Sequence, residues 1–251
     1  MAGVKKATAR EAFDDNMRDA HYLVLLAESL TNLRKRRMRR ELRERIGEAL
    51  KLPARDHSEL DCIESAEAFI VLTPRSRLSR DGLQDQRPLL RQALVAACAA
   101  TETYLADAVL AKARSMTTSE QAAGPRLAQL PMTVGDWLYI EQHYERRRWG
   151  LNERILAKHI REEASTAPNQ VGKLLALVGV GTWTRKLDGE RKVARGDTEA
   201  LLDRVTRRRN KIAHEGDRRG RSRATLTVDE VKADLADLES VVGAIERVLA
   251  T

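Results

Sequence analysis

The chain has 251 residues, of which 42% are hydrophobic and only 4% aromatic. This is enough apolar material to bury a core, so a disordered chain is excluded, and the abundance of alanine, leucine, arginine and glutamate predicts an all-α fold. The formal net charge of +8 makes nucleic acid the first partner to consider, although arginine used as an ordinary surface cation explains the charge equally well.

The two cysteines, Cys62 and Cys98, lie in separate apolar patterns. They form no C-x-x-C pair, so the sequence predicts neither a disulfide framework nor a zinc site, and no dinucleotide-binding motif is present. No apolar run approaches the roughly 18 residues that suggest a membrane span, and the first residues, MAGVKKATAREAF, lack the apolar centre of a secretion signal. We therefore expect a soluble cytoplasmic protein that binds no metal ion or cofactor and does not associate with a membrane.

The first part of the chain predicts helices around a basic segment. Between residues 11 and 33 the apolar side chains recur at steps of three and four, which predicts an amphipathic helix. A basic helix is expected over residues 34–50, ending before Pro53, and a short helix near residues 60–72. We interpret residues 1–80 as an N-terminal helical extension, whose basic helix either binds RNA or presents an ordinary solvated face.

Residues 81–251 are expected to form the main helical domain, after a linker with a turn at Asp81-Gly82. Pro88 suits the first turn of a long apolar helix that extends to residue 114 and forms the centre of the core. Further helix-like runs cover residues 134–163 and 170–178. The stretch TRKLDGERKVARG that follows is polar and punctuated by glycines, so a connecting loop is predicted there.

Two helices complete the predicted domain. Asp197 or Thr198 is positioned to cap the first of them. The second begins with a capping box formed by Thr227 and Glu230. Its apolar residues repeat in strict steps of four and three, which predicts packing against another helix of the same chain or of a partner copy: Val231, Leu235, Leu238, Val242, Ile245 and Leu249.

The nine residues RNKIAHEGD, at positions 209–217, place an arginine, an amide and a histidine where a helix is expected to end. On an ideal helix a step of five residues turns the chain by about 140°, so Arg209 and His214 would lie on different faces. They converge only if the helix ends or distorts between them. Gly216 suits a left-handed closing position, and we therefore expect Arg209, Asn210 and His214 to surround one small polar space.

That set of side chains can cleave an RNA phosphodiester without a metal ion. A neutral His214 takes the proton of a ribose 2′-hydroxyl, which attacks the adjacent phosphorus, while Arg209 stabilises the charge that develops on the non-bridging oxygens. Asn210 positions a phosphate or fixes the imidazole. The spacing alone is unspecific, because Arg154 and His159 show the same separation inside an ordinary amphipathic helix. The specificity comes from Asn210, from the apolar pair before the histidine and from the helix-ending EGD.

The segment RRRNKIAHEGD resembles the R-N-x-x-x-H signature of HEPN domains, an all-helical superfamily of ribonucleases in toxin–antitoxin, phage-defence and RNA-processing systems. With RQALVAACAATETYLADAV, LLALVGVGTW and LTVDEV, the wider context resembles more closely the branch called RiboL-PSP-HEPN. The resemblance runs from about Pro88 to the C terminus and covers the N-terminal helices loosely. It implies a HEPN-like helical bundle, catalytic roles for Arg209, Asn210 and His214, and a homodimer whose two copies form a composite active site.

Further residues around the motif are expected to assist. In domains of this kind an acidic or polar residue on an earlier core helix often supports the arginine. Glu102 is the first candidate and Asp107 the second, although a solvent-facing or helix-pairing carboxylate is the more common role. Trp149, beside three arginines, either stacks on a base or packs in the protein, and we interpret it as packing. Six cations near the motif are expected to bind RNA: Arg207, Arg208, Lys211, Arg218, Arg219 and Arg221.

Three functions are consistent with these patterns. The first is a metal-independent endoribonuclease that leaves a 2′,3′-cyclic phosphate and a 5′-hydroxyl, acting as a toxin held by an antitoxin or within a defence complex. The second is a HEPN module without catalysis that binds RNA or nucleotides, or that scaffolds a larger complex. The third is a helical DNA-binding regulator, which the sequence disfavours because no recognition helix preceded by a tight turn is present.

Overall fold

The computed structural model describes residues 7–31, 40–59, 86–117, 126–220 and 222–250. These residues are mostly helical, which confirms the predicted all-α class. In the described part of the chain the extended structure is limited to a small antiparallel hairpin of β1 (Arg218–Arg219) and β2 (Ser222–Arg223).

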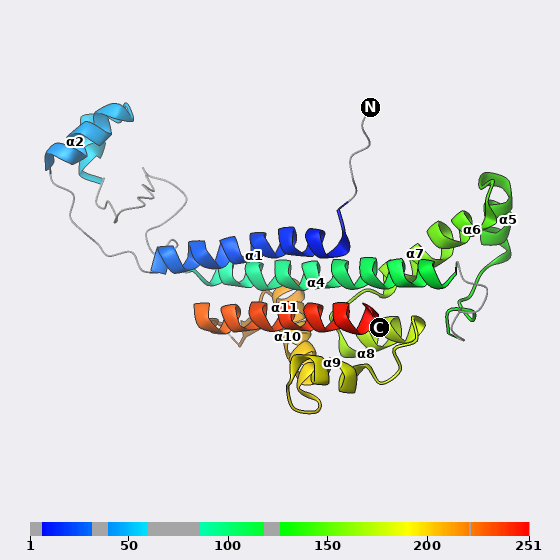
Figure 1. Ribbon diagram of the computed structural model, residues 1–251. Coiled ribbons are helices and arrows are strands. Elements are labelled where there is room, and N and C mark those ends of the chain that lie inside the picture. The colour runs from blue at the N-terminus through cyan, green and yellow to red at the C-terminus, as the bar shows by residue number, and fades with distance from the viewer. Residues whose placement is uncertain (1–6, 32–39, 60–85, 118–125, 221, 251) are drawn as a thin grey trace.

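Three long helices lie side by side and form the centre of the molecule (Figure 1): α1 (Ala9–Thr31), α4 (Arg87–Met116) and α11 (Val228–Ala250). The middle helix, α4, runs antiparallel to α1 and parallel to α11 (Figure 1). Small side chains at its contacts let the neighbouring helices approach closely, and they are fully or almost fully buried: Ala93, Ala97, Ala100, Ala106 and Ala113.

The helix α1 is an integral part of this core. The predicted stripe is confirmed, because Phe13, Met17, Ala20, Val24 and Ala27 are all buried in the same hydrophobic cluster as α4 and α11. Polar contacts add to the packing between α1 and α11: His21 Nε2 lies 2.8 Å from Glu239 Oε1, and Lys232 Nζ forms an ion pair with Glu28 Oε2 at 2.7 Å. Residues 9–31 therefore belong to the main bundle rather than to an extension.

The remainder of the predicted extension is separate from this core. The helix α2 (Arg40–Ala49) matches the C-terminal part of the predicted basic helix, and the 3₁₀ turn η1 (Ala54–Glu59) follows it. Among the described elements these two contact each other and nothing else. The chain leaves α2 through Lys51, whose φ of +54° closes the helix before Pro53. The predicted helix near residues 60–72 and the Asp81-Gly82 turn lie outside the described residues.

By length and composition alone, α4 is long and apolar enough to cross a membrane, contrary to our expectation that no run approaches that length. Most of its apolar stretch is buried inside the protein, against α1 and α11. The apolar composition of α4 is therefore accounted for by its place as the core helix of the bundle.

Four helical segments follow the core helix, with an interruption inside the run that the sequence predicted over residues 134–163. Tyr144 adopts an extended conformation (φ −123°, ψ 118°) and interrupts the predicted run over residues 134–163. The segments are α5 (Val134–His143), α6 (Arg147–Gly150) with the π-helical turn η2 (Leu151–Leu156), α7 (Ala157–Glu163) and α8 (Pro168–Leu177). Of these, α7 and α8 pack on α4, whereas α5 lies beyond the end of the bundle (Figure 1).

The prediction of a loop over TRKLDGERKVARG is wrong, because most of these residues belong to α9 (Trp183–Arg191). Leu187 is fully buried and Asp188 is almost so. Burial of one apolar side chain and the tertiary bonds of one carboxylate outweigh a polar, glycine-containing composition that alone favours a loop. Lys192, with a φ of +57°, ends the helix.

The predicted cap of the next helix, α10 (Asp197–Glu215), is also wrong, and Asp188 is the residue involved. Neither Asp197 nor Thr198 caps it; the N-cap position is Gly196, at φ +91°. The carboxylate of Asp188 accepts hydrogen bonds from the backbone N–H groups of Gly196 (2.8 Å) and Thr198 (3.0 Å). A carboxylate beside a helix N-terminus also interacts favourably with the helix dipole. The cap is therefore supplied by α9 rather than by α10 itself.

The last helix, α11, matches its prediction closely. The Thr227 N–H donates to Glu230 Oε2 (2.8 Å) and the Glu230 N–H donates to Thr227 Oγ1 (3.2 Å), which confirms the capping box. Its predicted apolar stripe faces the core, with Val231, Leu235, Leu238, Val242 and Ile245 buried and Leu249 packed at the margin.

Candidate functional site

The motif residues lie in the last two turns of α10, which packs on α4 and also contacts α8, α9 and α11. The predicted helix end is confirmed: Gly216 adopts the left-handed conformation (φ +60°), and the Asp217 N–H donates to the Lys211 carbonyl (2.9 Å). However, the helix stays continuous through Glu215, so it neither ends nor distorts between Arg209 and His214. The predicted convergence within one chain is therefore wrong, because five residues of regular helix separate the two side chains by about 140°.

The guanidinium of Arg209 is held against the core helix. Its Nη2 lies 2.9 Å from Glu102 Oε2, and its Nη1 donates to Asn210 Oδ1 (3.1 Å). The other carboxylate oxygen, Glu102 Oε1, accepts the Thr166 backbone N–H (3.2 Å), and Thr206 Oγ1 donates to Thr166 Oγ1 (2.9 Å). The predicted contact between Glu102 and Arg209 is thus present, and α4, α10 and the loop before α8 all contribute to it.

The second predicted carboxylate is not part of this arrangement. Asp107 is half-buried on α4, and among the described residues it makes no hydrogen bond or ion pair with α10. A separation of five residues from Glu102 places Asp107 on another face of α4, by the same geometry that separates Arg209 from His214.

The end of α10 is fastened by a buried cluster that the sequence did not predict. Asp217 is 1% exposed, has a φ of +59°, and its Oδ2 accepts bonds from Arg91 Nε and Arg208 Nη2, both at 2.9 Å. The same two guanidiniums donate to the carbonyls of Ala224 (2.8 Å) and Thr225 (2.9 Å). The cluster joins α4, α10 and the segment after the hairpin, so the position of the motif helix relative to α4 is fixed at Arg209 and again at Asp217.

This cluster carries an excess of positive charge. It contains two guanidiniums and one carboxylate, and within the described structure Arg91 Nη1 and Arg208 Nε are buried without a hydrogen-bond partner. Arg208 was predicted to bind RNA, but its side chain is turned inward to Asp217. Its role is therefore structural, and the burial of Arg91, with Arg208 partly buried beside it, makes the carboxylate of Asp217 important to the local balance of charge.

The other motif residues are directed to solvent. His214, Asn210 and Lys211 are exposed, and no described residue forms a hydrogen bond or ion pair with His214. Arg207 is exposed and paired with Asp203 (2.9 Å) one turn earlier, and Arg218 in the hairpin is also exposed. The imidazole is thus free to meet a ligand or a second copy of the chain. Arg221 lies outside the described residues, and only the backbone of Arg219 is described.

Cys98 lies on α4 near the Glu102–Arg209 pair and is fully buried. Burial raises the pKa of its thiol to about 12, with a further increase from the charge of Glu102 and a smaller opposing effect of Arg209. The thiol therefore stays protonated near neutral pH, which makes it an unreactive core residue rather than a nucleophile.

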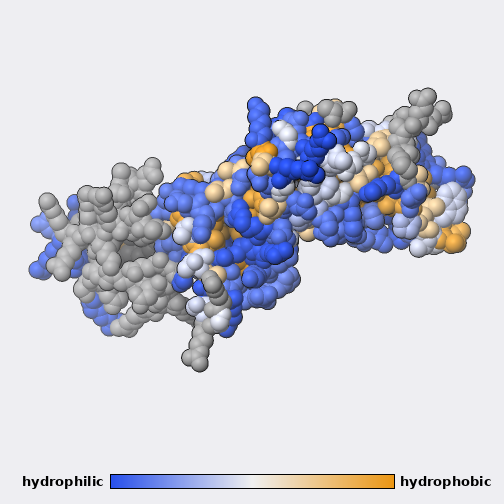
Figure 2. Space-filling view, turned by 90° about the horizontal axis from the view of Figure 1, so that it is seen from below, coloured by the Kyte–Doolittle hydropathy of each residue, from blue (hydrophilic) through white to orange (hydrophobic). Residues whose placement is uncertain are grey.

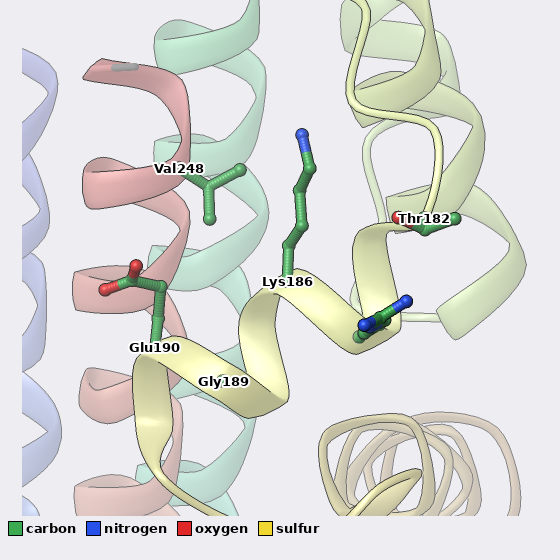
Figure 3. A pocket seen from close by; sticks show the side chains of 6 residues that line it. Thr182, Lys186, Gly189, Glu190 and Val248 are labelled. Carbon is green, nitrogen blue, oxygen red and sulfur yellow. The ribbon is translucent and has the colours of Figure 1, made fainter.

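A surface cavity of about 480 Å³ lies between α9 and the end of α11. Figure 3 shows the Lys186 side chain extending into the space beside Val248, with Glu190 closer to α11. The Glu190 carboxylate is engaged by Arg247 Nε at 2.7 Å. None of the lining residues belongs to the motif, so the cavity and the end of α10 are separate features.

Comparison with known proteins gives no match to a family model, a curated protein or a solved structure. Within the described residues no group of three or more histidine, cysteine, aspartate or glutamate side chains is arranged to hold a metal ion.

Proposed function

We propose that the chain is a metal-independent endoribonuclease of the HEPN type that acts as a homodimer in a toxin–antitoxin or anti-phage defence setting. The observation that carries the proposal is the different environment of two motif residues on α10. Arg209 is oriented by Glu102, whereas His214 is solvent-exposed at the helix end. An oriented cation and an accessible imidazole are the groups that metal-free cleavage of RNA requires.

A second copy completes the site. Because Arg209 and His214 point about 140° apart on one helix, a single chain does not present both to one phosphate. In the proposed dimer, Arg209 of one copy approaches the exposed face of α10 in the other copy, where His214 lies. That face carries Arg207, Asn210, Lys211 and His214, so the cleft between two copies is polar and basic, which suits a polyanionic substrate.

The chemistry follows from this arrangement. A neutral His214 accepts the proton of the 2′-hydroxyl, the 2′ oxygen attacks phosphorus, and the bond to the 5′ oxygen breaks. The leaving oxygen takes up a proton from solvent and His214 is left protonated, so the products are a 2′,3′-cyclic phosphate and a 5′-hydroxyl. Arg209 stabilises the negative charge on the non-bridging oxygens, and Glu102 keeps its guanidinium in place.

One observation favours a second function, an RNA-binding or scaffolding module without catalysis. Arg209 already donates to Glu102 and to Asn210 within the chain. If those bonds persist when RNA is bound, Arg209 acts as a structural residue and the exposed basic face only binds. This reading predicts RNA binding that His214→Ala leaves intact and no cleavage by the wild-type chain.

Mixed dimers test the composite site. Arg209→Ala and His214→Ala should each be inactive alone, but a heterodimer formed by unfolding and refolding them together contains one complete site. Random pairing makes half the dimers heterodimers with one of two sites intact, so activity should return to roughly a quarter of the wild-type value. An active wild type whose mixed variants stay inactive would contradict the composite site, and an inactive wild type would contradict the nuclease itself.

A further inference from the structure

The segment 132–156, which we call the arm, projects beyond the end of α4 and is joined to α4 through η2. It comprises α5, α6 and η2 with the residues just before them, and among the described elements α5 contacts only α6 and η2. Ile140 and Gly150 are buried against each other, and a Cβ at Gly150 would lie 2.6 Å from Ile140 Cγ2. This close contact fixes α5 on α6, and the arm then extends beyond the end of α4 (Figure 1).

The arm exposes large apolar and aromatic side chains. Trp149 is 61% exposed, which overturns our interpretation of this residue as packing. The other large exposed side chains of the arm are Met132, Val134, Trp137, Leu138 and Tyr139. Figure 2 shows orange and pale residues at the α5 end, in contrast to the mostly hydrophilic surface of the bundle beside it. A concentration of such residues in one place marks an interaction surface.

An arginine guanidinium lies over each of the three exposed rings Trp137, Tyr139 and Trp149 of the arm. Arg146 Cζ lies 5.4 Å from the centre of the Trp149 ring, Arg147 Cζ 5.5 Å from that of Trp137, and Arg154 Cζ 4.5 Å from that of Tyr139. These are cation–π distances. The His143 ring stacks on Tyr139, with 4.1 Å between centres and 13° between planes.

The three guanidiniums are not equivalent. Arg147 is also paired with Glu141 and Arg154 with Asp136, so these two cations help to fasten α5 to the rest of the arm. Arg146 has no ion pair with any described residue, and Trp149 is the most exposed of the three rings. The pair of Arg146 and Trp149, with the exposed Arg148 between them in sequence, is therefore the part of the arm best able to bind a ligand.

We propose that the arm binds unpaired RNA, with bases stacked on Trp149 and Trp137 and phosphates bound by Arg146 and Arg148. Exposed rings alternating with guanidiniums are the combination that single-stranded nucleic acid requires, because each base offers a stacking face and each linkage offers an anion. A duplex keeps its bases stacked on one another and cannot use the rings. The choice of RNA rather than another anion rests on the proposed function. With the arm included, the substrate of the proposed nuclease is single-stranded RNA.

The chain also provides a matched control. Val134 and Leu138 are exposed aliphatic residues on α5 itself, 76% and 51% exposed. A protein partner docking on the arm would bury them, whereas stacked bases gain little from them. Comparing the loss of the rings with the loss of these aliphatic side chains therefore separates RNA from protein as the occupant.

The test uses the full chain carrying His214→Ala, so that binding is measured without cleavage. Fluorescence anisotropy with a short labelled oligouridine should show that Trp149→Ala weakens binding by about 5- to 100-fold, the effect of losing one stacked base. Val134→Ser with Leu138→Ser should leave the affinity unchanged, and the labelled duplex should bind equally well to both variants. Circular dichroism of each variant checks that α5 and α6 remain folded.

The opposite pattern overturns the inference. If Trp149→Ala binds the single strand like its parent, or if the aliphatic variant loses binding or self-association instead, the arm is not an RNA-stacking surface. The readout is independent of catalysis. If the wild type binds oligouridine through Trp149 but never cuts RNA, the proposed nuclease is refuted and the RNA-binding role of the arm stands. If the wild type cuts RNA and the Trp149→Ala protein binds and cuts RNA equally well, the nuclease stands and the role of the arm is refuted.

Discussion

The helices α10 and α11 are of similar length and both pack on α4, but they are held in different ways. Apolar side chains of α11 are buried along almost its whole length, from Val231 to Val248. In α10 the buried residues end at Thr206, and the part that carries the motif is held by Glu102 and by Asp217. The difference indicates that α11 stabilises the bundle, while the C-terminal half of α10 uses polar contacts to hold charged groups at the surface.

The largest expected effect on stability is in α11. Leu238 is fully buried, so Leu238→Ala should lower the free energy of unfolding by about 2–5 kcal/mol, through lost burial and the cavity left behind. Urea denaturation measures the loss, and Leu138→Ala on the exposed face of α5 is the control, with a change below about 0.5 kcal/mol. An equal loss of unfolding free energy in Arg209→Ala and Leu238→Ala would contradict this difference between the two helices.

Asp217→Asn should have the next largest effect. The amide keeps an acceptor and tolerates the left-handed backbone, but it removes the only negative charge between Arg91 and Arg208. Leaving the buried guanidinium of Arg91 without its counter-charge should reduce the free energy of unfolding by about 3 kcal/mol. Asp203→Asn removes an exposed pair with Arg207 and should change stability by less than about 0.5 kcal/mol in the same denaturation experiment. Equal effects of the two substitutions would mean that the cluster at Asp217 does not hold the end of α10.

Glu102→Gln addresses the polar contact at the motif itself. Without the carboxylate, Arg209 is oriented less firmly, so the single-turnover cleavage rate should fall by about 10-fold, while RNA binding stays the same or tightens because one negative charge is lost. Asp107→Asn, on the same helix but away from Arg209, should leave the rate unchanged. A Glu102→Gln protein that cleaves at the wild-type rate would show that the pair between Glu102 and Arg209 serves only the fold.

The smallest effect concerns the start of α10. Burial opposes ionisation of Asp188, but hydrogen bonds from Thr198 and from the Gly196 N–H outweigh it and lower the pKa of the carboxyl below its usual range. The unfolded chain therefore binds the proton more readily, and the stabilisation is present above the ordinary pKa of about 3.9 and lost as the pH falls through the lowered value. Asp188→Asn should cost about 1 kcal/mol at neutral pH, and the difference from wild type in urea denaturation should shrink in acid. A difference that does not change with pH would contradict this account.

The sequence predicted α1 and α11 well because their residues carry the information locally. The stripe from Phe13 to Ala27 and the capping box at Thr227 each depend on spacing within one helix. The left-handed Gly216 followed from the same kind of signal. Fold class and the ends of these helices could therefore be predicted without knowing their neighbours.

Several failures have the opposite cause, because the role of the residue depends on a partner in another part of the fold. Three successive arginines illustrate it: turned by about 100° each, Arg207 lies in solvent, Arg208 binds Asp217, and Arg209 binds Glu102. The cap that Asp188 of α9 provides for α10 is of the same kind. Composition and spacing cannot distinguish such residues, since the partner decides the role of each.

Cleavage of labelled single-stranded and structured RNAs in EDTA, by the wild type, Arg209→Ala and His214→Ala, tests the central claim most directly. The account predicts EDTA-resistant cutting that leaves 2′,3′-cyclic phosphate and 5′-hydroxyl ends and that falls by at least about 100-fold in each variant. Cutting that requires a divalent metal ion, or that persists in His214→Ala, would contradict it.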